Sequence, residues 1–241
     1  MAQLRALAPL FLLAAATPAH AAERVWNIAS FDRVRVDGPF EVRIATGASP
    51  RARASAADPA LLDRLRLNVE GGTLSLRLDR GTDDYARSGA TRGADGPPVF
   101  TLSTVALKGV TLLSGARVTV PRMSGARLDL GVTGTGSLSV DEASAEQVNA
   151  TVIGSGSIRL AGRAGKARLV TNGPGTIDAD ALSAGELFVS LDGSGETRAA
   201  ARYSAEIAST GMGRVTVSGT PKCTVRAAAG GPVSCGVLPA R

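Results

Sequence analysis

The sequence predicts an all-β protein: a single-stranded parallel β-helix, or solenoid, with coils of about 18–20 residues, preceded by a short β-rich N-terminal cap region. Three observations predict this fold. A Gly-x-Gly motif recurs at nearly constant spacing, the residues around each copy alternate between apolar and polar, and only 3% of the 241 residues are aromatic. Because 44% of the residues are hydrophobic, the chain can still bury a core, which must consist mainly of small aliphatic side chains.

Residues 1–21 have the features of a secretory signal peptide. Arg5 supplies a positive charge, residues 6–16 form an apolar run too short to cross a bilayer, and Ala19-His20-Ala21 matches an A-x-A cleavage site. The alternative is an uncleaved N-terminal anchor. Cleavage near Ala21 would export the protein to the periplasm or cell surface, with no transmembrane segment in the mature chain. It would also remove His20, the only histidine, which excludes His-based catalysis and metal sites.

Residues 22–109 form the N-terminal β-rich part, which we expect to hold short strands. Gly71-Gly72 predicts a hairpin turn, and Asp58-Pro59 predicts the start of a short helix with Asp58 as its N-cap. Residues 79–98 contain four Gly, two Pro and four Asp but no Val, Ile, Leu or Phe, which predicts a flexible loop. The strands are marked by alternating apolar residues: Val34 and Val36; Val42 and Ile44; Leu65, Leu67 and Val69; Leu74, Leu76 and Leu78.

The repeats occupy residues 110–236 and are followed by a C-terminal tail, residues 237–241. Successive motifs begin 20, 19, 20 and 18 residues apart. The corner of each coil needs residues that tolerate a positive φ and close stacking of backbones, and glycine supplies both. The structural turn glycines are Gly134 and Gly136, Gly154 and Gly156, Gly173 and Gly175, Gly193 and Gly195, and Gly211 and Gly213.

Stacking six copies of the repeat on their corners gives the register. At five inward positions per copy, 27 of 30 residues are apolar and none is charged, whereas charges fall at the alternate positions. Each coil therefore has one strand before its corner and one after it. We expect a looser third side to close each coil, at residues 141–145, 161–165 and 180–184, and neighbouring coils to stack about 4.8 Å apart.

Two segments outside the repeats strengthen a family resemblance. The opening Phe31-Asp-Arg-Val-Arg-Val-Asp-Gly-Pro-Phe-Glu-Val-Arg-Ile and the segment Val69-Glu-Gly-Gly-Thr-Leu-Ser-Leu occur together with the Gly-x-Gly repeats and in order. The chain from about residue 30 to 236 resembles the bacterial exported family called putative auto-transporter adhesin, head GIN domain. The resemblance implies a β-helical exported protein that binds or adheres, and it brings no catalytic residues.

Arg159, Asp178 and Arg198 occupy one outward column on successive coils and are the candidate binding residues. A carboxylate between two guanidinium groups is a feature that a site for an acidic polysaccharide, or a lyase acting on one, would use. The alternative is a surface charge ladder without a ligand, in which each cross-strand pair contributes about 0.2–1 kcal/mol.

No metal site or cofactor is expected. A calcium-binding Gly-rich roll needs an Asp after each corner, where this chain has Leu138, Ile158, Ile177, Thr197 and Val215. Three further features each have two interpretations. Asp83, Asp84 and Asp95 are either a loose cation site or a solvated linker, the outward Phe188 either packs beneath the third side or marks a contact patch, and Asn149-Ala-Thr151 is either a glycosylation acceptor or a chance match.

These observations favour a non-enzymatic exported protein that serves as a periplasmic or cell-surface scaffold for binding or adhesion, with no catalytic residues. Its partner would be an envelope or extracellular polymer or protein of unknown identity. Nucleic acid is not expected outside the cytoplasm, and the mature net charge of +5 (26 basic minus 21 acidic residues) is scattered and not clustered. The alternative is a carbohydrate-active enzyme, a polysaccharide lyase or hydrolase, on a β-helix. A third possibility is a structural envelope protein without a small ligand.

Cys223 and Cys235 predict a disulfide bond. They lie six residues before and six residues after the last, degenerate corner, so both fall in inward columns and should point at each other across the end of the core. The last coil of a solenoid has no neighbour to cover it, and export to an oxidising compartment would allow the bond to form. The alternatives are two free buried thiols or a redox pair.

Overall fold

The computed structural model describes residues 22–79, 96–228 and 230–236. The predicted signal peptide, most of the predicted loop and the C-terminal tail lie outside these residues, as do Asp83, Asp84 and Asp95. The elements, in chain order, are β1 (Ala22–Trp26), β2 (Arg33–Asp37), β3 (Glu41–Thr46), β4 (Arg51–Ala56), α1 (Pro59–Asp63), β5 (Leu65–Glu70), β6 (Thr73–Leu78), β7 (Val99–Thr104), β8 (Gly109–Leu112), β9 (Arg117–Gly134), β10 (Ser137–Gly154), β11 (Ser157–Asn172), β12 (Thr176–Asp192), β13 (Glu196–Ser209), β14 (Arg214–Gly219), β15 (Lys222–Ala227) and β16 (Val233–Cys235).

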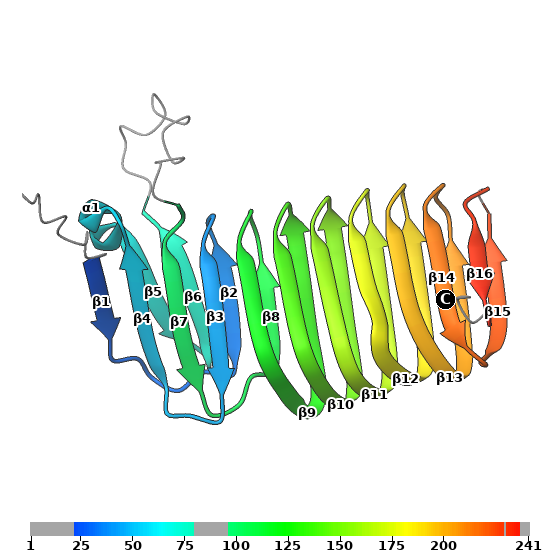
Figure 1. Ribbon diagram of the computed structural model, residues 1–241, viewed down its shortest axis with the longest axis horizontal. Helices are drawn as coiled ribbons and strands as arrows, with labels where there is room; N and C mark the ends of the chain where they lie inside the picture. The colour runs from blue at the N-terminus through cyan, green and yellow to red at the C-terminus, as the bar shows by residue number, and fades with distance from the viewer. Residues whose placement is uncertain (1–21, 80–95, 229, 237–241) are drawn as a thin grey trace, which may run out of the picture.

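Strands β9 to β13 confirm the predicted parallel solenoid. Each covers nearly a whole coil and pairs in parallel with the coils before and after it, with Gly-x-Gly corners along the upper edge of Figure 1 and smooth bends along the lower edge. The expected looser third side is wrong, because the strand continues through it. In β10 the bend is made by two consecutive exposed residues, Asp141 and Glu142, and the register with β11 shifts at these residues, as at a bulge.

The corners and bends divide the solenoid into two sheets that face each other. Face A is formed by the segments that follow a corner, such as residues 137–141 of β10, and face B by the segments that lead into the next corner, such as residues 147–153. Side chains alternate along each segment, so every second residue points into the core and the others point to solvent.

The predicted register is the observed one. On face A, Leu138 of β10 pairs with Ile158 of β11, and Ile158 pairs with Ile177 of β12. On face B, Val148 pairs with Ala167 and Ala167 with Leu187, and all these side chains are at most 4% exposed. The three polar residues of the inward columns, Thr171, Thr197 and Ser209, are buried as well.

The two corner glycines have different roles. At the corner of β11 and β12, Gly173 has a φ of +105°, which side-chain-bearing residues rarely adopt. Gly175 has no such φ, but a Cβ there would lie 2.7 Å from the carbonyl oxygens of both Gly154 and Gly156 on the coil below. The first glycine therefore makes the turn at this corner, and the second lets the coils approach. Gly134, Gly154 and Gly193 share the positive φ of Gly173, whereas Gly211 does not.

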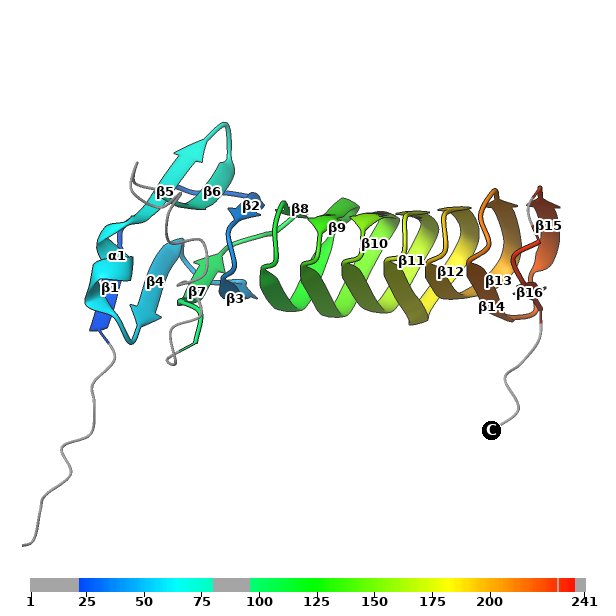
Figure 2. The ribbon, with the colours of Figure 1, turned by 90° about the horizontal axis from the view of Figure 1, so that it is seen from above.

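The N-terminal part extends both faces of the solenoid (Figure 2). Face A continues through β3, β7, β4 and β1, and face B continues through β8, β2, β6 and β5. The β3–β7 and β2–β6 pairs are parallel, whereas the outermost pairs, β1–β4 and β5–β6, are antiparallel. The β5–β6 hairpin turns at Gly71 and Gly72, whose φ angles are +55° and +75°, as the sequence predicted.

Helix α1 closes the N-terminal end of the core. It connects β4 on face A to β5 on face B, and its Leu62 is 5% exposed. Pro59 is its first residue, and the Asp58 carboxylate accepts a hydrogen bond from the Ala60 amide at 2.9 Å, which confirms the predicted N-cap. The N-terminal end is thus covered by a connection within the chain.

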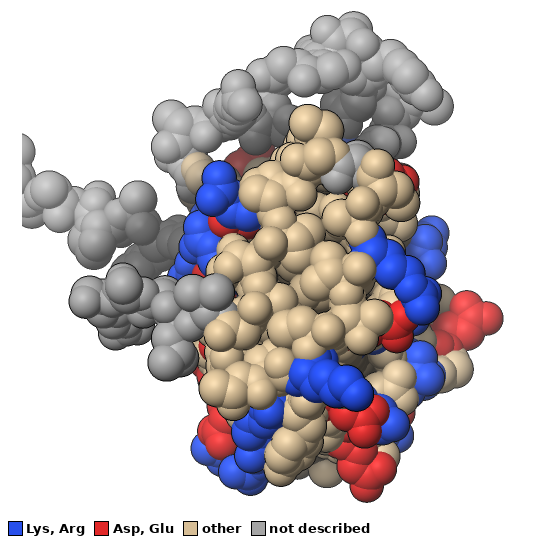
Figure 3. Space-filling model, turned by 90° about the vertical axis from the view of Figure 1, so that its right-hand side faces the viewer, with Lys and Arg blue, Asp and Glu red and all other residues tan. Residues whose placement is uncertain are grey.

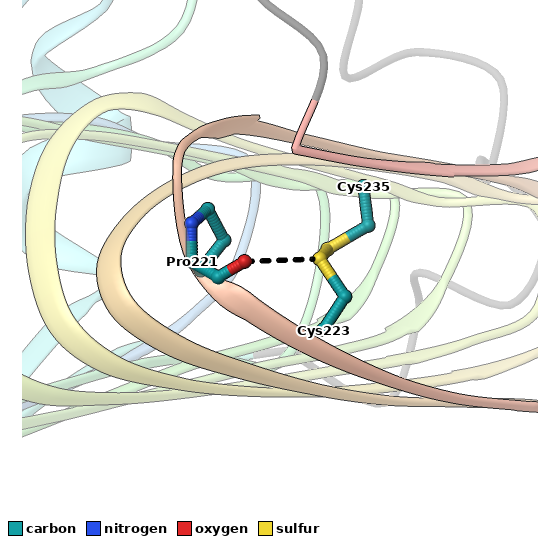
Figure 4. The surroundings of a disulfide bond; sticks show 3 residues. All are labelled: Pro221, Cys223 and Cys235. Atoms are coloured by element: carbon teal, nitrogen blue, oxygen red, sulfur yellow. Dashed lines mark hydrogen bonds between the residues drawn. A yellow bond between two sulfur atoms is a disulfide. The ribbon is translucent and has the colours of Figure 1, made fainter.

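The C-terminal end is covered differently. Strand β15 is the last strand of face B and β16 the last of face A, and the disulfide between Cys223 and Cys235 joins them across the end of the core (Figure 4). The stacked register predicted that three residues of β15 point inward and are buried: Cys223, Val225 and Ala227. They are exposed instead, because no further coil covers them. Viewed end-on, this surface is mostly uncharged in its centre, with charged side chains around the rim (Figure 3).

Candidate binding surface

The predicted ladder on face A is formed, but its charges are already paired. Arg159, Asp178 and Arg198 are register partners on β11, β12 and β13. The Arg159 Nε lies 3.6 Å from an Asp178 carboxylate oxygen, whereas Arg198 turns along its own strand and donates from Nε to Glu196 at 3.0 Å. The structure therefore brings Arg159 and Asp178 together and directs Arg198 away from them.

Phe188 faces outward from β12 on face B and is half-buried. The guanidinium carbon of Arg168, its register partner on β11, lies 4.4 Å from the centre of the phenyl ring. This is a cation–π contact on the outer surface. Of the two interpretations of Phe188, the structure thus gives no support to packing beneath the third side.

A groove of about 500 Å³ runs beside Phe188, across the strands. One wall is the column Lys166, Glu186, Ser204 and Lys222, and the other is the column Arg168, Phe188, Glu206 and Thr224. A second groove of about 550 Å³ shares Gln147, Lys166 and Glu186 with the first and reaches Arg127 on β9. The remaining residues of the second groove, Ala126, Glu146 and Gly165, precede the Lys166 column, so the two grooves flank that column on opposite sides. We call the first one, which spans face B from β10 to β15, the Phe188 groove.

The charges of the Phe188 groove do not cancel. Lys166 Nζ lies 2.9 Å from Glu186, and Arg226 Nη1 lies 3.4 Å from Glu206, so both carboxylates at the first groove have a basic partner. Within the described part of the chain, Arg168 and Lys222 form no ion pair. Two cationic groups that line the groove, Arg168 and Lys222, are therefore not matched by a carboxylate.

Sequence reasoning named Phe188 but missed the residues around it. The signal that would have found them is the stacked register itself. Lys166, Glu186 and Lys222 share the position seven residues before the corner, and Arg168 and Glu206 share the column of Phe188. The predicted acceptor residue Asn149 lies on the same face, where its side-chain amide donates to Asp129 at 2.7 Å and accepts from Gln147 at 3.0 Å.

One carboxylate has a clearly shifted pKa, and it lies away from both surfaces. A hydrogen bond from Lys108 Nζ, 2.8 Å from Asp32 Oδ2, holds the pKa of Asp32 below its usual value, against partial burial that acts in the opposite direction. This pair fastens the start of β2 to the start of β8. Among residues 22–79, 96–228 and 230–236, no cluster of three or more acidic or Cys side chains could hold a metal ion, and no helix is long and apolar enough to cross a membrane.

These features define a class: a two-sided parallel β-solenoid whose outer faces present aligned columns of polar side chains. The chain belongs to the family described as "Putative auto-transporter adhesin, head GIN domain", whose sequence model matches residues 30–221. The family is named for adhesion, which fits an exported or surface-located protein that binds a partner.

Solved structures share the fold. A putative adhesin from Bacteroides fragilis superimposes with a TM-score of 0.81 at 19% identity, over 90% of this chain and 97% of that one. A putative adhesin from Parabacteroides distasonis gives a TM-score of 0.71 at 17% identity, with 90% and 98% covered. A protein from the same organism described as a putative lipid binding protein also gives 0.71 at 17% identity, with 90% and 97% covered. No curated protein matches the sequence.

Proposed function

We propose that this protein is a non-enzymatic, exported scaffold that holds a polymer or protein of the cell envelope or its surroundings by its outer faces. The observation that carries the proposal is the solenoid itself, in which consecutive coils repeat the same outward positions along two extended faces. Such a surface offers many weak contacts in line, which suits an extended partner. The signal peptide of residues 1–21, cleaved near Ala21, belongs to the proposal and accounts for its location.

The core leaves a ligand no place inside the solenoid. The inward side chains of β9 to β12 are at most 4% exposed, so the coils are filled by their own residues. A partner, including a lipid of the kind suggested by the description of one structural neighbour, would therefore have to bind on the outer surface. This is the reason for proposing adhesion to a surface or polymer instead of storage or transport of a small molecule.

Two outer surfaces are candidates for the contact: the ladder of Arg159, Asp178 and Arg198 on face A, and the Phe188 groove on face B. The ladder offers guanidinium groups that are already neutralised by carboxylates. The groove offers a half-buried aromatic ring beside cations that are not neutralised. An acidic polysaccharide is the alternative partner for either surface, and the groove has the better charge complementarity to it.

The test is capture by the purified chain beginning at Ala22, immobilised through its C-terminus. Envelope extract is separated into polysaccharide, peptidoglycan and protein fractions, and retention of each is measured against a column of the same protein unfolded by reduction and heat. Saturable retention of one fraction by the folded protein alone is expected. Equal retention by both columns, or none by either, would contradict the scaffold proposal.

A further inference from the structure

The Phe188 groove combines the chemical groups that a carbohydrate needs. Sugar hydroxyls both donate and accept hydrogen bonds, and the walls supply acceptors at Glu186 and Glu206, a donor at Lys166 and hydroxyls at Ser204 and Thr224. The Phe188 ring supplies an apolar surface for the C–H face of a sugar ring. A lipid acyl chain would leave most of these polar groups without a partner.

A peptide cannot bind in the groove as an added β-strand. At the floor of the groove, β11 and β12 pair with a neighbour on each side along face B, so their backbone groups are already used. An occupant must therefore be held by side chains alone.

The unmatched positive charges of the groove indicate which kind of sugar it would bind. Glu186 and Glu206 each have a basic partner, whereas Arg168 and Lys222 have no carboxylate partner among the residues that the structure describes. Arg168 and Lys222 lie on opposite sides of Phe188 along the groove. Carboxylates on the ligand would supply the missing partners, and the planar Arg168 guanidinium, which contacts the Phe188 ring, can bind a carboxylate at two points.

We propose that the Phe188 groove binds an acidic saccharide chain, a polyuronate, that lies along the solenoid axis across the strands of face B. Phe188 contacts a sugar face, and Arg168 and Lys222 each pair with a carboxylate. The length of the groove, from Gln147 on β10 to Lys222 on β15, favours a chain over a single sugar. This assignment rests on the proposed scaffold function and specifies the ligand class of one of its two surfaces.

The experiment measures binding of the chain beginning at Ala22 to polygalacturonate by affinity electrophoresis and by titration calorimetry. Fully methyl-esterified polygalacturonate is the neutral comparison, and dextran sulfate is the comparison for charge without a uronate. The groove variants are Phe188→Ala and the double change Arg168→Ala with Lys222→Ala. The comparison for the competing surface is Arg159→Ala with Arg198→Ala, which removes the same charge from face A. Circular dichroism and the melting midpoint confirm that each variant folds.

Polygalacturonate should bind the wild type, and its methyl ester should not. Phe188→Ala should weaken binding by about tenfold and the groove double variant by at least as much, while the face A variant stays within about twofold. Three results would each overturn the groove assignment. They are equal losses in the two double variants, stronger binding to dextran sulfate that Phe188→Ala does not weaken, and a loss confined to the face A variant. A wild type that does not bind polygalacturonate would also overturn the groove assignment. If the same protein still captures envelope material, the scaffold proposal stands without the groove assignment.

Discussion

The hydroxyl oxygens of Thr171 and Thr197 lie 3.0 Å apart inside the solenoid, although 26 residues separate them in the sequence. Thr171 comes from face B of one coil and Thr197 from face A of another, and both are at most 1% exposed. Their hydrogen bond connects the two faces through an otherwise apolar core. It explains how polar side chains can occupy two inward positions of the repeat.

Removing one partner of this pair should cost more than removing both. Thr171→Val leaves the Thr197 hydroxyl buried without a partner and should lower the free energy of unfolding by about 1–3 kcal/mol, whereas adding Thr197→Val should restore most of it. Urea unfolding of the two single variants and the double variant measures this. Ser209→Ala is the control, because the Ser209 hydroxyl is buried and has no partner, so its removal should cost nothing. Additive losses from the two threonines would contradict the coupling.

Loss of the disulfide should loosen one end of the molecule and leave the middle intact. Cys223 and Cys235 are 12 residues apart, and closing a loop of this size stabilises by about 3 kcal/mol in the chain-entropy model. In the double variant Cys223→Ser and Cys235→Ser, amides of β15 and β16 should exchange faster, while those of β10 and β11 keep their protection. Thiol counting on denatured, unreduced protein should find none, and two reactive thiols would refute the bond.

A methyl group at the second corner glycine should be poorly tolerated. The new Cβ of Gly175→Ala would press on two carbonyl oxygens of the coil below, so we expect a loss of about 2–3 kcal/mol in unfolding free energy. Gly230→Ala is the matched control, because Gly230 has nothing within 4 Å of the Cβ position and no positive φ. Comparable midpoints of thermal unfolding for the two variants would show that close stacking at the corner is not limiting.

The contact between Asp32 and Lys108 should contribute to the way in which the free energy of unfolding depends on acid pH. Because the pKa of Asp32 in the folded state is below 3.8, its ionised form stabilises the fold above that pH, and this contribution is lost as the pH falls through the lowered pKa. The side chains are partly exposed, so about 0.5 kcal/mol is at stake. Asp32→Asn should remove this pH dependence of unfolding near pH 3.8, and Lys108→Met should reduce it, because the hydrogen bond from Lys108 is the largest cause of the lowered pKa. A wild-type slope in either variant would contradict the pairing.

The repeats could be predicted in detail because their information is local and redundant. Each coil restates which positions point inward, so the column of Leu138, Ile158 and Ile177 follows from counting residues between glycines. The same counting places Arg159 beside Asp178 and Arg168 beside Phe188. It does not show which rotamers those side chains adopt, and Arg198 pairs with Glu196 on its own strand for that reason.

The N-terminal part was less predictable because its strands do not repeat. Strand β4 alternates Arg51 and Arg53 with Ala52 and Ala54, and alanine is too weakly hydrophobic to mark a buried face in the sequence. Its pairing with β7, across residues 57–98, is decided by contacts distant in the chain. The bends escaped prediction for another reason: a continuous strand with one bulge and a loop of the same length have similar composition.

Each coil of the solenoid connects only to the coils before and after it, so this architecture can form with different numbers of coils. Insertion or removal of one whole coil between β10 and β12 would change the reach of both faces by about one strand spacing, 4.8 Å, and leave the helix at one end and the disulfide at the other as they are. The length of both faces is thus set by the number of coils. The span of the molecule could evolve in whole-coil steps, with both end closures kept the same.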